Sequence, residues 1–219
     1  FELGAQRLDI RVSGEVRDND GNLVVGDLAN YTVRIDLALV GDDTSEEIVL
    51  DVADGYTYVE ARGGDDLVVG SEASEEIVGG AGDDNLQGGA GDDVLSDSQG
   101  TNTLSGGSGD DIINLTGTST PQGTIDGGEG IDTLRVASDT NFSNLSVSNV
   151  EILDGRGGRT QLTPQDVLER GFTTANNITF QLNSNNSDGE LDASGLLGNF
   201  TLRGTNQSDV LIGNADDNT

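Results

Sequence analysis

Two adjacent stretches, Gly-Gly-Ala-Gly-Asp-Asp-Asn-Leu-Gln (79–87) and Gly-Gly-Ala-Gly-Asp-Asp-Val-Leu-Ser (88–96), are almost the same nine residues written twice. The period continues in both directions, so that residues 61–114 form six consecutive blocks of nine. A fixed short period indicates one supersecondary unit that is stacked on copies of itself, because a single unit cannot bury its apolar side alone. The sequence therefore predicts a solenoid.

Two positions of the block keep their chemical character throughout. The sixth position carries an oxygen ligand in every block: Asp66, Glu75, Asp84, Asp93, Asn102 and Asp111. The eighth position is always aliphatic: Val68, Ile77, Leu86, Leu95, Leu104 and Ile113. A seventh block at 127–135 follows a longer turn and restores the pattern with Asp132 and Leu134. A disordered acidic linker has no reason to keep both positions in register, so the repeat favours a folded stack.

Glycines fill the first, second and fourth positions of the clearest blocks: Gly79, Gly80, Gly82, Gly88, Gly89, Gly91, Gly106, Gly107, Gly109, Gly127, Gly128 and Gly130. We expect them to adopt positive φ, so that the loop turns tightly and points carbonyl oxygens inward. The sixth-position carboxylate joins the same concavity. Calcium accepts about six to eight such hard oxygen ligands. The next three residues are expected to form a short strand whose central aliphatic side chain faces inward.

The blocks resemble the G-G-x-G-x-D-x-U-x nonapeptide of RTX proteins, a family of calcium-binding parallel β-rolls. The resemblance covers about a third of the chain and implies an all-β parallel β-roll whose turns alternate between two sides. One side would carry Asp66, Asp84 and Asn102, and the other Glu75, Asp93, Asp111 and Asp132. Calcium would lie between turns two blocks apart, with roughly five Ca²⁺ ions in total. Glu75 is longer than Asp and Asn102 is uncharged, so we expect their sites to be weaker.

Residues 1–60 form a strand-rich N-terminal flank. Apolar and polar residues alternate in 8–12 and 31–37, which predicts half-buried strands. The acidic segment 18–22 between them favours a hairpin turn over an EF-hand loop, because the first ligand position would be Val16 and no helix flanks it. Residues 41–49 resemble block 70–78, so they are either an early turn of the same solenoid or an unrelated strand end.

Residues 136–203 form a β-rich spacer that lacks the metal motif. Short strands are expected at 145–147, 150–153, 178–182 and 200–202. One short helix is expected near 163–170, with Thr163 as its N-cap, Pro164 in the first turn and Gly171 beyond its end.

A further block begins after the spacer. Residues 204–212 return Asp209 and Leu211 to the sixth and eighth positions, so residues 204–219 are interpreted as the truncated start of a second RTX array. With the N-terminal flank, the calcium-binding β-roll at 61–135 and the spacer, this gives four segments. The chain begins at Phe1 without Met, so we expect it to be a piece of a longer protein.

The amino-acid composition excludes several classes of partner and of catalytic site. The chain has 40 acidic and 10 basic residues, a net charge of −30, and no His or Cys. This charge disfavours nucleic acid and membrane surfaces and concentrates cations. The absence of His and Cys removes histidine-based triads, thiol nucleophiles and His-ligated zinc. Composition leaves a carboxylate pair for glycoside hydrolysis open, but the repeat places the acidic residues that stand out, so no enzymatic activity is expected. No apolar run is long enough to span a membrane, which predicts no membrane insertion.

The favoured hypothesis is a calcium-binding structural module of a secreted bacterial cell-surface protein, of the adhesin or surface-layer type. The RTX resemblance implies type I secretion and folding on calcium binding after export. Calcium is the expected partner, together with copies of the chain or other cell-surface components. The alternative is the C-terminal calcium-binding secretion module of an exported enzyme or toxin, such as a protease, lipase, epimerase or cytolysin. Strands before the array and a second array after a spacer favour the first hypothesis.

Overall fold

The computed structural model describes residues 37–97, 99–115, 117, 121–160, 162, 164–181, 190–205 and 208–215. Apart from Leu37, the strands expected at 8–12 and 31–37 lie outside these residues, as does the hairpin turn expected at 18–22. The described elements are strands, apart from the 3₁₀ turn η2 (Val52–Asp54) and the short helix α1 (Pro164–Glu169). No helix among the described residues is long and apolar enough to cross a membrane.

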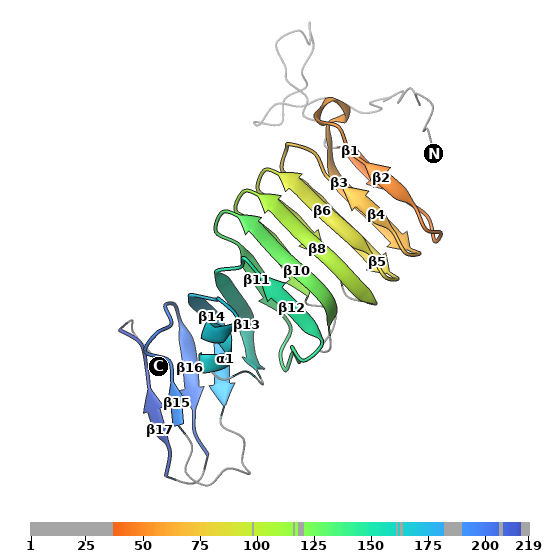
Figure 1. The fold of residues 1–219 in the computed structure, drawn as a ribbon. Coiled ribbons are helices and arrows are strands. Elements are labelled where there is room, and N and C mark those ends of the chain that lie inside the picture. The colour runs from red at the N-terminus through yellow and green to blue at the C-terminus, as the bar shows by residue number, and fades with distance from the viewer. Residues whose placement is uncertain are drawn as a thin grey trace, which may run out of the picture. The chain divides into compact units, whose positions relative to one another are not determined.

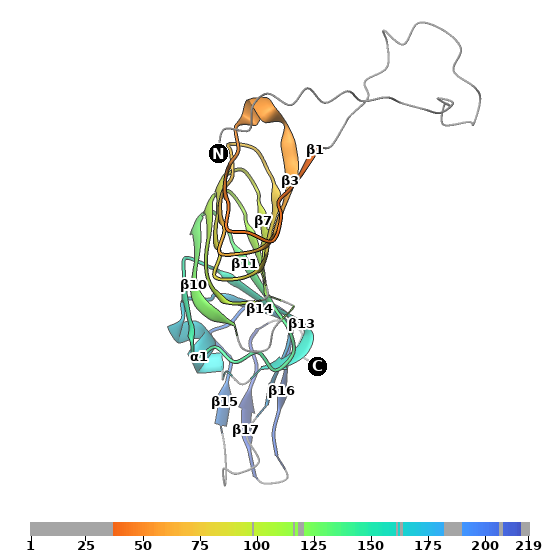
Figure 2. The same ribbon diagram turned by 90° about the vertical axis from the view of Figure 1, so that its right-hand side faces the viewer.

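The strands form two main parallel sheets, and successive strands of the repeat alternate between them (Figure 1). The nine-stranded sheet has the order β1 (Leu37–Val40), β3 (Tyr56–Gly63), β5 (Glu76–Ala81), β7 (Val94–Ser96), β9 (Ile112–Leu115), β11 (Thr133–Val136), β13 (Ile152–Thr160), β14 (Thr174–Gln181) and β16 (Phe200–Arg203). The six-stranded sheet has the order β12 (Leu145–Ser148), β10 (Gln122–Glu129), β8 (Thr101–Ser108), β6 (Asn85–Ala90), β4 (Leu67–Val69) and β2 (Glu47–Val49). A third, two-stranded sheet pairs β15 (Glu190–Asp192) with β17 (Val210–Ile212). Figure 2 looks nearly along the repeat, where the turns superpose as flattened loops. The predicted parallel β-roll is confirmed.

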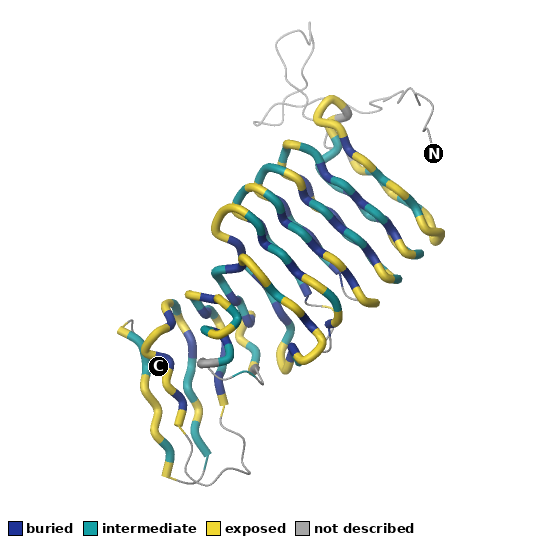
Figure 3. Tube along the Cα trace, viewed as in Figure 1, coloured by how far each residue is buried: buried dark blue, intermediate teal, exposed yellow. Residues whose placement is uncertain are grey.

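The eighth-position aliphatic side chains form the core of the repeat. All seven, from Val68 to Leu134, are at most 1% exposed. In the six-stranded sheet Val68 pairs with Leu86 and Leu86 with Leu104; in the nine-stranded sheet Ile77, Leu95, Ile113 and Leu134 pair in the same way. Burial alternates along each strand of the repeat (Figure 3). Each strand of the repeat therefore gives the interior little more than one large side chain, and the core is thin.

The turn before the repeat belongs to the same stack. β2 pairs in parallel with β4, with Ile48 opposite Val68. Residues 41–49 are thus an early turn of the solenoid and not an unrelated strand end.

The spacer continues the nine-stranded sheet through β13, β14 and β16. Its core is filled by larger side chains, since Phe142, Phe172, Phe180 and Phe200 are buried and the rings of Phe180 and Phe200 meet edge to face at 5.6 Å. The expected helix is present as α1 and ends at Glu169. Gly171 lies beyond this end, has a φ of 93° and donates its N–H to Leu168 O at 3.0 Å. The expected cap, Thr163, lies outside the described residues.

Candidate metal centre

The sixth-position side chains form two hydrogen-bonded ladders, one on each side of the roll. In each ladder a side-chain oxygen accepts the backbone N–H of the sixth-position residue one turn earlier on the same side. Asp84 Oδ1 accepts from Asp66 at 2.9 Å, and Asn102 Oδ1 accepts from Asp84 at 2.9 Å. On the other side Asp93, Asp111 and Asp132 accept in turn from Glu75, Asp93 and Asp111, each at 2.8 Å. The fold thus brings together the two sets that the RTX resemblance implies.

The fifth-position aspartates hold the same turns from the outside. Asp110 N donates to Asp92 Oδ1 at 2.9 Å, whereas Asp93 N donates to Asp111 Oδ1 at 2.8 Å, so the two bonds run in opposite directions between the same pair of turns. The same reciprocal pair joins the other turns through Asp65, Asp83 and Asp110. Sequence analysis gave this position no role, although the recurring Asp-Asp pair was its signal.

The second carboxylate oxygen of the ladder residues has no hydrogen-bond partner. Among the described residues this holds for the buried Oδ2 atoms of Asp66, Asp84, Asp93, Asp111 and Asp132. A buried carboxylate oxygen without a partner is destabilising, by about 1–3 kcal/mol or more. Because the same atom is unsatisfied on successive turns, we infer that a ligand binds at each of them. An ionised carboxylate oxygen can only accept or coordinate, so this ligand is expected to be a cation.

The first-position glycines leave room for that cation. A Cβ added to Gly88 would lie 2.5 Å from Gly106 O and closer still to Asp93 Oδ2; one added to Gly106 would lie 2.5 Å from Gly127 O and closer still to Asp111 Oδ2. Gly127 stands in the same relation to Asp132 Oδ2 and Asn149 O. A cradle is defined here as the space beside a first-position glycine, and each of these three cradles combines a carboxylate from one turn with a carbonyl from the next turn on the same side. These are the oxygen types that calcium prefers.

The expected backbone role of these first-position glycines was wrong. Positive φ occurs at the second and fourth positions, for example 117° at Gly107 and 136° at Gly109, but not at Gly79, Gly88, Gly106 or Gly127. The first position instead requires glycine because the carboxylate and the carbonyl leave no space for a Cβ. Among the described residues no three acidic side chains form a metal-binding group, and the oxygen beside each carboxylate in the cradles of Gly88, Gly106 and Gly127 is a backbone carbonyl.

Three predicted ligands depart from this arrangement. The Glu75 carboxylate folds back onto its own loop, where it accepts hydrogen bonds from Ser71 N at 3.2 Å and from the Ser71 hydroxyl. Asn102 donates its amide to Gln99 O at 2.8 Å and brings no charge. Block 61–69 places Ala61, not glycine, at the first position. We therefore expect Glu75, Asn102 and Asp66 to contribute less to calcium affinity than Asp93, Asp111 and Asp132 do.

Two glutamates extend the ladders beyond the predicted residues. Glu151 Oε2 accepts from Asp132 N at 2.9 Å. At the other end Glu46 N donates to Asp66 Oδ1 at 2.8 Å, and the buried Glu46 Oε2 has no hydrogen-bond partner. A Cβ on Gly41 would meet Glu46 Oε2 and lie 2.8 Å from Ala61 O. The likeness of residues 41–49 to block 70–78 was the available signal for Glu46.

Asp209 lies beside the first-position Gly204 in the last block, but its Oδ2 accepts a hydrogen bond within its own loop, unlike the Oδ2 atoms of the ladder aspartates. It accepts from Thr205 N at 2.5 Å, and a Cβ on Gly204 would lie 2.5 Å from Asp209 Oδ2. The following strand, β17, includes Leu211, which is exposed, unlike the other eighth-position residues.

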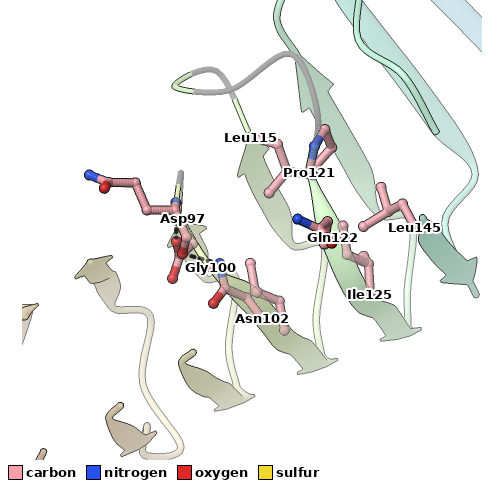
Figure 4. Close-up of a pocket in the computed structure, with 10 residues that line it drawn as sticks. Asp97, Gly100, Asn102, Leu115, Pro121, Gln122, Ile125 and Leu145 are labelled. Atoms are coloured by element: carbon pink, nitrogen blue, oxygen red, sulfur yellow. Dashed lines mark hydrogen bonds between the residues drawn. The ribbon is translucent and has the colours of Figure 1, made fainter. Parts of the chain in front are cut away.

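The ladder that contains Asn102 ends at a cavity of about 290 Å³ that is lined by residues of β8, β9, β10 and β12 (Figure 4). Asp97, Asn102 and Gln122 line its polar part, and Leu104, Ile125 and Leu145 belong to its apolar part. Gly123, which pairs with Asn102, occupies the position where the next ligand would stand.

The fold and its loops define a repeat protein, a parallel β-roll with stacked glycine–aspartate loops. Residues 69–96, 78–113 and 195–219 match the RTX calcium-binding nonapeptide repeat (4 copies), a repeat that is structural and typical of exported proteins. The chain therefore contains RTX repeats, and calcium binding is the property that the family supports. No curated protein and no solved structure matches the chain.

Without calcium, the folded state is expected to be more stable at pH 5 than at pH 8. Burial, together with the charges of Glu75 and Asp111, raises the pKa of Asp93 from 3.8 to about 7, and burial raises the pKa of Asp132 to about 6. The folded state then binds more protons than the unfolded state, so this contribution is complete below pH 3.8 and is lost as the pH rises through about 6–7.

The β-sheet circular dichroism signal that remains in calcium-free buffer at several pH values measures this effect, since little folded roll is expected there at pH 8. Asp93→Asn is the control, because it keeps the Oδ1 acceptor but cannot titrate, and its remaining signal should depend less steeply on pH. A remaining signal that rises from pH 5 to pH 8 would contradict the prediction.

Proposed function

We propose that this chain is a non-catalytic structural module of a secreted bacterial cell-surface protein, of the adhesin or surface-layer type, and that it folds on binding calcium after export. The observation that carries the proposal is the series of buried, unpartnered Oδ2 atoms along both sides of the roll. These carboxylates repel one another in the absence of a cation. With a cation in each cradle they become the contacts that hold adjacent turns together.

Because the core is thin, folding is expected to depend strongly on calcium. Between β4 and β9 each turn adds few large apolar side chains, so burial alone offsets little of the entropy that is lost when glycine-rich loops become ordered. A metal that binds only the folded state stabilises that state by mass action. The net charge of −30 adds repulsion, which roughly five calcium ions would reduce to roughly −20.

The four segments would then have separate tasks. Residues 61–135 form the calcium-binding roll, residues 136–203 form a spacer with a calcium-independent aromatic core, and residues 204–219 begin a second array. Residues 41–60 would extend the roll by an early turn, since β2 pairs with β4. The partners would be calcium and copies of the chain or other cell-surface components, with no role for nucleic acid or membrane insertion.

The dissociation constants expected for extracellular modules support folding outside the cell. Such sites bind calcium at about 10⁻⁴–10⁻³ M, far above the concentration in the cytosol. The chain would therefore remain unfolded before export, which suits passage through a narrow secretion channel.

The calcium concentration at the midpoint of folding tests the proposal. Circular dichroism during a calcium titration should give a midpoint of about 10⁻⁴–10⁻³ M. A midpoint below the micromolar range would mean that the chain folds before export, and the export-coupled function would be wrong. Titration with magnesium is the control, and it should give little folding because magnesium requires a small octahedral site.

A further inference from the structure

The cradle at Gly79 differs from the others. At Gly88, Gly106 and Gly127 an added Cβ would meet one carboxylate oxygen and one carbonyl oxygen. At Gly79 it would lie 2.6 Å from Asp84 Oδ2, and its nearest atom would be Asp97 Oδ2. Asp97 follows Gly79 by two blocks and stands at the first position of block 97–105, whereas the corresponding residue is Gly106 for the Gly88 cradle and Gly127 for the Gly106 cradle. Two carboxylates therefore approach one point.

The Asp97 side chain is fixed in this direction. It is only 4% exposed, and its Oδ1 accepts the backbone N–H of Gln99 at 3.1 Å. Its own N–H donates to Asn114 O at 3.2 Å, which holds the backbone of the turn. Oδ2 is thus the oxygen that faces Gly79.

Asp84 gives independent evidence for a ligand at this point. The residue is 2% exposed, its Oδ1 accepts from Asp66 N, and its buried Oδ2 has no hydrogen-bond partner. This unpartnered oxygen points into the same cradle as Asp97 Oδ2.

The same turn lacks a charge at the sixth position. Asn102 continues the hydrogen-bond ladder, with Oδ1 accepting from Asp84 N at 2.9 Å, but it brings no carboxylate. Asp97 and Asn102 both belong to this turn and line the same cavity (Figure 4). This turn therefore has one inward carboxylate, as the other turns do, but it stands at the first position of the block and not at the sixth.

We propose that Asp97 is a calcium ligand that forms, with Asp84, a two-carboxylate site at Gly79, and that this is the tightest calcium site of the roll. The proposal rests on the proposed function, because it assumes that the cradles bind calcium. Two carboxylates at one cation give a higher ligand charge than a carboxylate and a carbonyl, and ligand charge is one of the properties that set calcium affinity. Block 97–105, which departs most from the repeat, would then strengthen the stack.

Isothermal titration calorimetry of calcium into the metal-free full chain tests the proposal with three variants. Asp97→Asn keeps the acceptor for Gln99 N–H but removes the charge, and it should weaken the tightest binding step by about tenfold or more. Glu72→Gln removes an exposed charge outside the cradles and should leave that step within about twofold. The double variant Asp97→Gly with Asn102→Asp returns the carboxylate to the sixth position and should recover calcium binding of the ordinary one-carboxylate kind.

An Asp97→Asn isotherm equal to that of the wild type overturns the Asp97 site and leaves calcium-dependent folding intact. A wild-type chain that takes up no calcium overturns both. If Asp97→Asn does not fold in saturating calcium, a crystal structure of the wild type with terbium decides the question. An anomalous peak bonded to both Asp84 and Asp97 supports the site, and an Asp97 carboxylate turned away from the peak overturns it.

Discussion

Chelation with EDTA is expected to abolish most of the β-sheet signal from residues 61–135, and millimolar calcium is expected to restore it. The reason is the combination of unpartnered Oδ2 atoms on both sides of the roll with a core that is one aliphatic side chain wide. Without a cation these carboxylates are either charged, so that they repel one another, or protonated. Burial favours the protonated form, which is why it raises the pKa of Asp93. Circular dichroism of the full chain measures the overall loss.

Hydrogen exchange followed by mass spectrometry locates the loss along the chain. Peptides from β5 to β9 should lose protection in EDTA, because their turns depend on the cradles. Peptides from β14 and β16 should keep more protection, because Phe172, Phe180 and Phe200 give that part a core without metal. Equal protection of residues 61–135 with and without calcium would remove the mechanism on which the proposed function rests.

The periodic part of the fold could be predicted because both of its signals are local. The eighth-position aliphatic residues and sixth-position oxygen ligands recur at a fixed spacing, and a period of nine with two sides brings every second block together. Val68 therefore pairs with Leu86, and Asp84 accepts from Asp66 N. The spacer strands could be recognised individually, but their place in the nine-stranded sheet could not, because β13, β14 and β16 carry no repeat that fixes their register.

The details of the cradles were beyond the sequence because they depend on residues about 18–21 positions apart. Residue type alone does not reveal whether a glycine is needed for its φ or for space, which is why the role of the first-position glycines was misassigned. For the same reason the position of Asp97 beside Gly79 could not be predicted, because in the sequence Asp97 is only a departure from the repeat. The hydrogen bond of Glu75 to Ser71 in its own loop, which its extra methylene allows, could not be predicted either.

Gly106→Ala is expected to destabilise the calcium-bound fold by about 2–5 kcal/mol, which combines overpacking with the loss of one bound ion. The added methyl would lie 2.5 Å from Gly127 O and closer still to Asp111 Oδ2, whereas real Cβ contacts essentially never fall below 3.0 Å. Gly106 does not have positive φ, so the effect would come from space in the cradle and not from backbone strain.

Gly63→Ala is the matched control, because Gly63 also lies in a strand of the roll without positive φ. Its added Cβ would be 3.7 Å from both Ala81 O and Asp43 Oδ1, which is ordinary contact, so its stability should change by no more than about 0.5 kcal/mol. Urea unfolding of both variants at two calcium concentrations, one near the folding midpoint and one well above it, separates the two causes. Overpacking at Gly106 lowers the stability equally at both concentrations, but loss of the ion lowers the gain between them, so the stabilisation gained from added calcium should be smaller in Gly106→Ala than in the wild type. If that gain is unchanged, the space beside Gly106 is not where the cation binds, and the ligand set must lie elsewhere in the turn.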